Sequence, residues 1–378
     1  MRLYEYEAAN IFERNGIPVP DRDVATTPEE AQKIAEKLGC PVVLKAQVLV
    51  GGRGLAGGVK VAQSPEEAYT LSAGLLGVEI KGLPVRAILV ARKVEIEKEL
   101  YCGVVVDGYG GRPLVLVSAE GGMNIEEVAR RFPEKILSLP VEEPPGLFPY
   151  EARRLLRRLG FSSKRLVSGA DVLARLYRVF VNYNALIAEI NPLAMLTSGS
   201  FMALDAVLEV DDSALFRLGS LVSCDPQRIE NALERRGREI GVTYVDMDGD
   251  IGIMSSGAGL GMATMDIIAR KLRPANFLET GGGITEELLY RAMELIMMKG
   301  RLRAVFVNIY GGINPIHEAA RGIIRYMKEH DVRIPVVAKA LGNRQEETWE
   351  IFRSGGVHVV TDVATEKAVE RLVELLGA

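Results

Sequence analysis

The sequence predicts a mixed α+β region followed by a doubly wound α/β sheet, and two observations support this prediction. From about residue 245 the chain alternates strand and helix five times, and its apolar runs at 304–310 and 334–338 are continuous. Continuous apolar strands are typical of a parallel sheet that helices cover on both faces. Before residue 210, strands and helices follow one another without regular alternation, which is typical of an α+β domain.

The length of the chain sets the number of domains that can each bury a core. With 378 residues, two or three such domains are possible. We expect a first domain over 1–209 with two subdomains, a charged helical connector over 210–244, and a flavodoxin-like domain over 245–378. In open α/β sheets of this kind, ligands bind beyond the carboxyl ends of the strands.

The N-terminal elements follow from local signals. Gly16 and Pro18 end a helix that we expect over 4–15. A second helix begins after Thr27, because Thr is a favourable N-cap and Pro28 suits the first helical position. Hydrophobic periodicity predicts further helices over 65–75, 124–131, 149–159 and 164–182, and strands over 41–48, 58–62, 86–94, 99–107, 112–119, 184–195 and 200–209.

Each C-terminal unit joins a short apolar strand to a following helix. Strands alternating with helical segments indicate βαβ units and therefore a parallel sheet. The strands are expected over 251–256, 275–278, 304–310, 334–340 and 358–361, and the helices are expected to begin near residues 260, 285, 315, 345 and 364.

The composition excludes several classes of function. The net charge is −4 and no long basic run occurs, so we expect no nucleic acid partner. No apolar run reaches the ~18 residues that a membrane span needs, and the N-terminus carries acids where a signal peptide would be apolar. The three cysteines, Cys40, Cys102 and Cys224, are scattered, which makes disulfides and zinc sites improbable and indicates a cytoplasmic protein.

The most informative segment is a glycine-rich loop between two short strands. It begins after Lys45 and has five glycines in the eight residues 51–58, with Arg53 between Gly52 and Gly54. Residues 52–57 fit the G-x-G-x-x-G dinucleotide fingerprint, but that fingerprint requires a helix directly after the loop, and here a strand follows. We therefore expect a flap whose amides and two cations bind a nucleoside triphosphate. The alternative is a glycine hairpin that binds no ligand.

A predicted hairpin over 184–209 carries the second set of polar residues. Its turn centres near Ser198, so Asn191 and Asp205 lie nearly opposite each other on neighbouring strands. Opposed residues have Cβ atoms roughly 4.5–5.5 Å apart, which allows an amide oxygen and a carboxylate to share one Mg²⁺. The alternative is an Asn that caps a turn before Pro192 and a solvated Asp.

Three glycine-rich loops follow strands of the C-terminal sheet, over 255–260, 279–285 and 310–315. Each opens a helix, so each offers helix N-terminal amides to an anion at one edge of the sheet. The alternative is a set of tight turns that merely require glycine. Among the three histidines, His317 follows the third loop and has either a role there or a place on the helix surface, whereas His330 is expected to be solvated and His358 to lie in the core or at its rim.

Together these segments resemble the β subunits of succinyl-CoA synthetases (succinate–CoA ligases, NDP-forming). The resemblance runs from residue 3 to the last helix and implies an ATP-grasp domain over 1–209 followed by a flavodoxin-like ligase domain. It is carried by residues 3–8, 51–61, 98–101, 189–193, 257–260, 264–266, 274–278 and 307–313.

The resemblance implies a reversible reaction in the citric acid cycle, in which a small carboxylic acid, CoA and ATP or GTP give acyl-CoA, nucleoside diphosphate and phosphate. The phosphate travels on a histidine of a partner α subunit, which also binds CoA, in a heterodimer or heterotetramer. The implied roles in this chain are nucleotide binding for Lys45, Gly52, Arg53, Gly54 and Glu99; Mg²⁺ binding for Asn191 and Asp205; a catalytic role for Glu189, which steadies the phosphohistidine; and binding of acid and phosphate for Ser256, Gly311, Gly312 and Ile313.

Three positions depart from the family pattern. Ala91 stands where a Glu usually lies near the nucleotide base, and Ser256 stands where an Asn is usual. The run 314–317 replaces a run that usually contains Arg, Cys and Asp. The choice between ATP and GTP and the identity of the acid therefore stay open. Succinate is the first expectation, a sister ligase for malate or another small carboxylate is an alternative, and a non-catalytic nucleotide-binding subunit is a third possibility.

Overall fold

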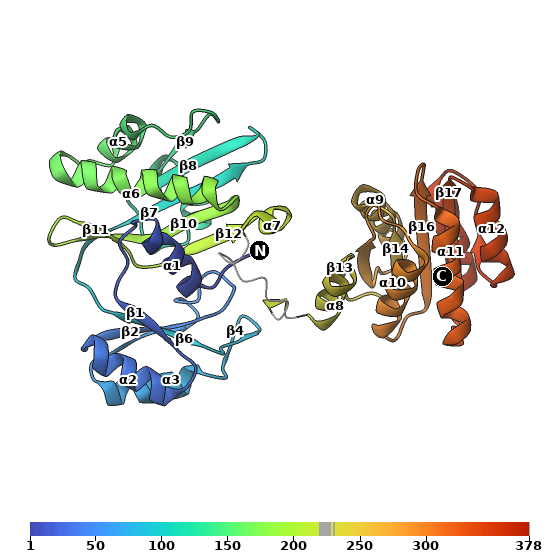
Figure 1. Ribbon diagram of the computed structural model, residues 1–378, viewed down its shortest axis with the longest axis horizontal. Helices are drawn as coiled ribbons and strands as arrows, with labels where there is room; N and C mark the ends of the chain where they lie inside the picture. Colours follow the sequence, from blue (N-terminus) through green and yellow to red (C-terminus); the bar gives the residue numbers. More distant parts are fainter. Residues whose placement is uncertain (219–227, 230, 378) are drawn as a thin grey trace. The chain divides into compact units, whose positions relative to one another are not determined.

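The computed structural model describes residues 1–218, 228–229 and 231–377. The chain divides into two compact units, Met1–Ser223 and Cys224–Ala378, and each is described here by itself (Figure 1). Residues 219–227 and 230 of the expected connector, including Cys224, lie outside the described residues.

A small antiparallel sheet forms one half of the first unit. Its strand order is β1-β6-β2-β3, and helices α2 and α3 lie together on one side of it (Figure 1). Both helices begin as the sequence predicts, because Thr27 and Ser64 cap them and a proline fills the first turn. The bounds are β1 (Arg22–Ala25), α2 (Pro28–Leu38), β2 (Val42–Ala46), β3 (Val59–Ala62), α3 (Pro65–Leu75) and β6 (Ile88–Arg92), with a short pair β4 (Glu79–Ile80) and β5 (Leu83–Pro84) beside them.

A larger sheet with the order β11-β10-β7-β8-β9 forms the other half, and β12 also pairs with β10. Helices α1, α5 and α6 supply buried residues to the core of this half. The bounds are α1 (Glu5–Arg14), β7 (Ile96–Asp107), β8 (Arg112–Ser118), α4 (Ile125–Arg131), η1 (Pro133–Lys135), β9 (Ile136–Pro140), α5 (Pro149–Arg158), α6 (Ser163–Asn182), β10 (Ala185–Leu196), β11 (Phe201–Ala203), β12 (Val207–Val210), η2 (Asp212–Ala214) and α7 (Leu215–Leu218).

The structure differs from the sequence prediction at several strands of this unit. Strands β1 and β9 and the short pair β4 and β5 are absent from the prediction. The single strand predicted over 200–209 is wrong in one respect, because residues 204–206 leave the ladder and divide it into β11 and β12. Both segments still pair with β10, and this interruption contains Asp205.

The second unit is a doubly wound sheet with the strand order β13-β15-β14-β16-β17-β18. Its five parallel strands, numbered along the chain, have the order 2-1-3-4-5, which confirms the flavodoxin-like prediction. Helices α10, α11 and α12 pack over one core and α9 and α13 over the other. The bounds are β14 (Ile251–Ser255), α9 (Ala258–Ala269), β15 (Asn276–Glu279), α10 (Glu286–Met298), β16 (Ala304–Gly311), α11 (Ile316–Glu329), β17 (Val336–Gly342), α12 (Gln345–Ser354), β18 (His358–Val359) and α13 (Thr365–Leu376).

The described part of the expected connector contains η2 and α7, which belong to the first unit, and two elements of the second unit. Helix α8 (Ala232–Ile240) precedes β13 (Thr243–Asp246), which pairs antiparallel with β15 at the edge of the second sheet. Within the described ranges, none of the helices has both the length and the apolar character needed to cross a membrane.

Candidate active site

The glycine-rich loop joins two antiparallel strands, as the sequence predicts. Lys45, near the end of β2, pairs with Val59 at the start of β3, and the intervening residues form a turn rather than a helix. Gly52 and Gly57 have φ values of 72° and 79°, a region that residues with a Cβ rarely adopt. The loop is therefore a flap between strands, and the dinucleotide fingerprint is a coincidence of spacing.

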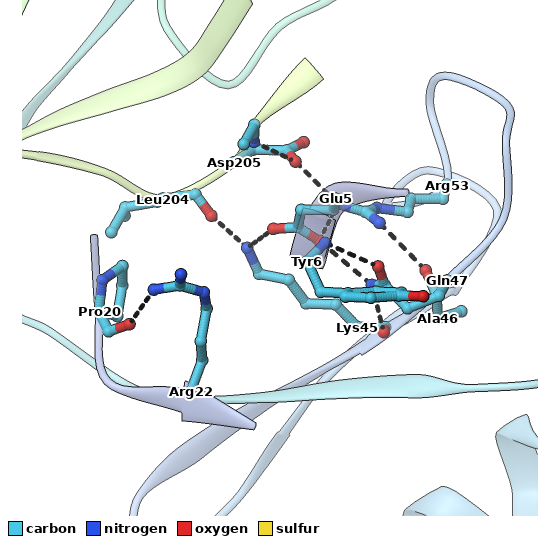
Figure 2. Close-up of polar contacts among 11 residues, drawn as sticks. Glu5, Tyr6, Pro20, Arg22, Lys45, Ala46, Gln47, Arg53, Leu204 and Asp205 are labelled. Atoms are coloured by element: carbon cyan, nitrogen blue, oxygen red, sulfur yellow. Dashed lines mark hydrogen bonds and ion pairs between the residues drawn. The ribbon is translucent and has the colours of Figure 1, made fainter. Parts of the chain in front are cut away.

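The two cations of this segment converge on a buried carboxylate of helix α1 (Figure 2). Lys45 Nζ lies 2.7 Å from Glu5 Oε1 and also donates to the carbonyl oxygen of Leu204. Arg53 donates from its Nη2 atom to Glu5 Oε2 and, at 2.8 Å, to Asp205 Oδ1. The network thus joins α1, the β2–β3 loop and the interruption between β11 and β12.

The charges in this network balance one another. Burial alone would raise the pKa of Glu5, but the positive charges of Arg53 and Lys45 outweigh burial and lower that pKa to about 2. Burial raises the pKa of Asp205, although Arg53 opposes the rise. Two cations and two carboxylates therefore lie within one cluster, and Glu5 is ionised throughout the physiological pH range.

A narrow cavity lies beside this cluster, between the two sheets of the first unit. Its volume is about 10 Å³, and Lys45, Ala91 and Asp205 are among the residues that line it. A cavity of this volume holds about one water molecule, so it is far too small for a nucleotide. Ala91, the position where the resemblance expects a Glu near the base, therefore lines the same space as the predicted phosphate and metal residues.

Asn191 and Asp205 lie opposite each other, as predicted from the turn. The pair Leu193–Ala203 of β10 and β11 and the pair Glu189–Val207 of β10 and β12 flank them on either side. Each side chain, however, is bound to a different segment. The Asn191 Oδ1 atom accepts from the Gly122 amide at 2.8 Å, and its Nδ2 donates to the Met123 carbonyl at 2.9 Å.

The oxygen donors of this pair fit a magnesium ion. Magnesium usually takes one or two protein oxygens and completes its coordination with water and phosphate. Asn191 Oδ1 has a second lone pair, and both hydrogen bonds to the Asp205 carboxylate, from Arg53 and from the Ala206 amide, reach Oδ1, leaving Oδ2 available. No cluster of three or more His, Cys, Asp and Glu side chains suited to a metal occurs in the part of the chain that the structure describes.

Glu189 lies on β10, two residues before Asn191, and is partly buried. Burial, followed by the negative charges of Asp205 and Glu126, raises the pKa of Glu189 to about 7. The hydroxyl of the buried Tyr101 donates to it at 3.4 Å. Glycine at residue 103 makes room for this tyrosine, because a Cβ at this position would lie 2.5 Å from the Tyr101 hydroxyl and would force it to shift.

Glu99 on β7 contacts the loop that binds Asn191. A Cβ on Gly122 would lie 2.5 Å from Glu99 Oε2, so the carboxylate packs closely against this glycine. The structure therefore brings Lys45, Arg53 and Asp205 together through Glu5, and Glu99 and Asn191 together through residues 122–123.

In the second unit, the three predicted loops follow β14, β15 and β16, which are neighbours in the sheet. Ser256 Oγ accepts from the Tyr310 amide at 2.9 Å and donates to the Tyr310 carbonyl at 3.0 Å. These two hydrogen bonds link the loop after β14 to the end of β16, at the point where the strand order of the sheet reverses. Gly311 lies in the same place, with its carbonyl bound to the Asn343 amide at 2.8 Å, while Ile313 is almost fully exposed.

The second loop precedes α10, as the sequence predicts, but its glycines lie outside the helix. The three glycines 281–283 precede α10 by a few residues, and Thr285 caps the helix by accepting from the Leu288 amide at 3.1 Å. The glycines therefore form a turn, in which Gly281 has a φ of 64° and donates from its amide to the Glu279 carboxylate at 2.8 Å.

His317 is not on the helix surface, so that alternative is wrong. Its side chain lies on the buried face of the first turn of α11, and its Nε2 lies 3.0 Å from Arg344 Nη1. A guanidinium can only donate, so Nε2 is the acceptor in this contact and Nδ1 is the other ring nitrogen. Within the described residues this Nδ1 has no hydrogen-bond partner. His330 is exposed, and His358 is partly buried, as predicted.

Sequence reasoning missed Glu5, Tyr101 and Arg344. Glu5 resembles an ordinary acid in the first turn of a helix, and only the two unneutralised cations of the β2–β3 segment could have indicated a buried counter-ion. Tyr101 and Arg344 give no local signal, because their roles depend on contacts with distant segments.

Comparison with known proteins is consistent with this geometry. Residues 2–195 match the family model of an ATP-grasp domain, and residues 254–373 match that of a CoA-ligase. The succinate–CoA ligase [GDP-forming] subunit beta of Thermus thermophilus is 43% identical over 375 residues, which cover 99% of each chain. The chain belongs to the succinate–CoA ligase β-subunit family. A second member, the succinate–CoA ligase [ADP-forming] subunit beta of Chloroflexus aurantiacus, is 45% identical over 92% of each chain.

Solved structures agree at the level of the fold. ATP citrate lyase from Methanothrix soehngenii, in complex with citrate and coenzyme A, superposes with a TM-score of 0.77 and 16% identity. The match covers 100% of this chain and 99% of that chain. The arrangement of an ATP-grasp domain followed by a ligase domain is therefore shared beyond the succinate–CoA ligase family.

Proposed function

We propose that this chain is the catalytic β subunit of an NDP-forming succinate–CoA ligase. With an α subunit it would convert succinate, CoA and a nucleoside triphosphate into succinyl-CoA, nucleoside diphosphate and phosphate. The observation that carries this proposal is the convergence of Lys45, Arg53 and Asp205 beside the cavity of the first unit, in a chain of this family.

The first unit would bind the nucleotide. Lys45, Arg53 and the amides around Gly52 and Gly54 are suited to phosphate oxygens, because they combine charge with close backbone approach. Glu99 would contribute to the same site. Mg²⁺ on Asn191 and Asp205 would offset the charge that develops during phosphoryl transfer.

Glu189 would steady the phosphohistidine of the α subunit at this site. A carboxyl whose pKa is about 7 can exchange a proton with an imidazole near neutral pH, since the two groups then have similar proton affinities. The proximity of Asp205, which raises this pKa, would place the carboxyl next to the transferring phosphate.

The second unit would bind the acid and phosphate at Ser256 and residues 311–313. The α subunit, which carries the phosphohistidine and the CoA site, would complete this part of the enzyme in a heterodimer or heterotetramer. The Ser256 hydroxyl already donates its only proton to the Tyr310 carbonyl, so it offers no donor to a carboxylate. Succinate stays the expected acid, and this observation predicts a weaker preference for it over acids such as malate.

A non-catalytic nucleotide-binding subunit is not favoured, because the cations and metal donors of the first unit are all present. Whether ATP or GTP is used depends on the base contacts near Ala91, and both nucleotides belong in the assay.

The test is to purify the chain with its α subunit and to assay acyl-CoA formation. Succinate, malate, itaconate and a monocarboxylate would each be supplied with CoA and with ATP or GTP. We expect succinyl-CoA from the complex and none from the isolated chain, which lacks the phosphate carrier but still binds Mg-nucleotide. Turnover by the isolated chain, or none by the complex with every acid, contradicts the proposal.

A further inference from the structure

Arg53 is shared by two carboxylates that lie in different surroundings (Figure 2). The Glu5 side chain is 4% exposed, whereas the Asp205 side chain is 30% exposed. One guanidinium nitrogen, Nη2, binds both, while Nη1 donates to the Ala46 carbonyl at 3.1 Å. The two carboxylates are therefore not equivalent partners of the arginine.

Glu5 is the fixed partner. It also contacts Lys45 at 2.7 Å and Gln47 at 3.3 Å, and it lies on a helix whose Ala8 and Phe12 are completely buried in the core. A buried carboxylate that loses its cation is strongly unfavourable, so Glu5 keeps Arg53 close.

Asp205 is the exchangeable partner. It lies in the short interruption between β11 and β12, and its other hydrogen bond comes from the adjacent Ala206 amide at 2.8 Å. A divalent cation that binds this carboxylate would repel the guanidinium, because like charges at such short separations disfavour each other. Arg53 and a divalent cation therefore compete for Asp205.

The same contact also connects the two halves of the first unit. Arg53 belongs to the β2–β3 loop of the small sheet, and Asp205 belongs to the interrupted hairpin of the large sheet. While they are paired, the cavity beside them has a volume of only about 10 Å³. Separation of the pair would release the loop and widen this cavity.

We propose that Arg53 balances the charge of Asp205 in the empty site through Oδ1 and moves to the nucleotide phosphates when a divalent cation binds the same carboxylate at Oδ2. Glu5 is the positioning residue that keeps the guanidinium within reach of both places. This inference rests on the proposed function, because it assigns the phosphate ligand of Arg53 to a nucleotide. It makes the metal the trigger for nucleotide binding.

The experiment measures metal and nucleotide binding separately on the full chain. Mn²⁺ alone is titrated by electron paramagnetic resonance, and ADP is titrated calorimetrically in saturating Mg²⁺. Arg53→Gln removes the competing cation, so Mn²⁺ should bind about tenfold more tightly, while ADP should bind at least about tenfold more weakly.

Glu5→Gln should have the opposite effect on the metal. Without its fixed partner, Arg53 would pair more strongly with Asp205, so Mn²⁺ should bind more weakly by about three- to tenfold. General disruption of the site would weaken metal binding in both variants, so opposite signs separate positioning from structure. Arg165→Gln is the matched control, because it removes the same charge from the surface pair with Glu97 and should alter neither affinity.

Unchanged or weaker Mn²⁺ binding in a folded Arg53→Gln chain overturns the inference. If that variant does not fold, Arg53→Lys is used instead, because it retains a positive charge for Glu5 but lacks the forked guanidinium. Arg53→Lys should still tighten Mn²⁺ binding, and an unchanged Mn²⁺ affinity in this variant also overturns the inference. The metal titration needs no nucleotide, so it also separates the two proposals. The expected Mn²⁺ shifts together with no acyl-CoA from the assembled complex would refute only the ligase function.

Discussion

Replacing Glu189 with glutamine should stabilise the protein at alkaline pH and not at acidic pH. A carboxyl whose pKa rises from 4.5 to about 7 on folding favours the folded state less once it ionises. Stability is unaffected below pH 4.5, falls as the pH rises from about 4.5 to 7, and stays lower above 7. The difference between the two pKa values corresponds to about 3 kcal/mol of unfolding free energy.

Glu189→Gln removes this ionisation while it keeps the shape of the side chain and an acceptor for Tyr101. For a unit of roughly 200 residues, about 3 kcal/mol corresponds to a rise of about 6–12 °C in Tm. Calorimetric melting of the full chain would be measured at pH 4.5 and pH 8. We expect the gain at pH 8 and almost none at pH 4.5.

Glu5→Gln provides a control of opposite sign. The pKa of Glu5 is lowered to about 2, so its ionised form stabilises the fold above pH 4.5, and this stabilisation is lost as the pH falls toward 2. The variant should therefore melt below the wild type at pH 8. An equal Tm change for Glu189→Gln at both pH values, or a decrease at pH 8, would refute the argument from burial and from the charge of Asp205.

Four further substitutions have defined outcomes. Asp205→Asn and Lys45→Ala should each abolish transfer of radiolabel from ATP to the α subunit with an unchanged circular dichroism spectrum, and wild-type labelling in either variant would contradict the assigned roles. Ser256→Asn should raise the kcat/KM preference for succinate over malate, itaconate and a monocarboxylate by about ten- to a hundredfold, because the amide supplies donors that the engaged hydroxyl lacks. If the wild type already prefers succinate by more than about a thousandfold, the inference that Ser256 makes this pocket less selective is wrong. Gly103→Ala should cost about 1–3 kcal/mol in urea unfolding, because its Cβ would displace the Tyr101 hydroxyl, and a cost below about 0.5 kcal/mol would show that the tyrosine moves freely.

Local signals were sufficient for most of the fold. The cap at Thr27, the continuous apolar strand over 304–310 and the strand after the glycine-rich loop each depend on neighbours in sequence, and each prediction is confirmed. The four-residue strand β1 and the strand β9 were missed because strands this short show little periodicity. Their place is determined by pairing with β6 and β8.

The sequence predicted those parts of the candidate site that depend on the spacing of residues within one segment. The opposition of Asn191 and Asp205 followed from the centre of one turn. Glu5 could not be found in this way, because its burial depends on packing of α1 against segments 40 or more residues away. His317 was a different case, since it shares an apolar helix face with Ala320 and Ile324, and this pattern could have indicated its burial.

The two separate cores have a consequence for how this enzyme family can change its substrate. The ligase unit buries its own residues on both faces of its sheet, and Ser256 and residues 312–315 lie on loops beyond the strand ends. Surface loops of this kind tolerate substitution better than the strands that carry them, and the residues that form the core of the first unit belong to a separate stretch of the chain. Substitutions in the loops proposed to bind the acid can therefore accumulate one at a time while the residues proposed to bind the nucleotide stay unchanged.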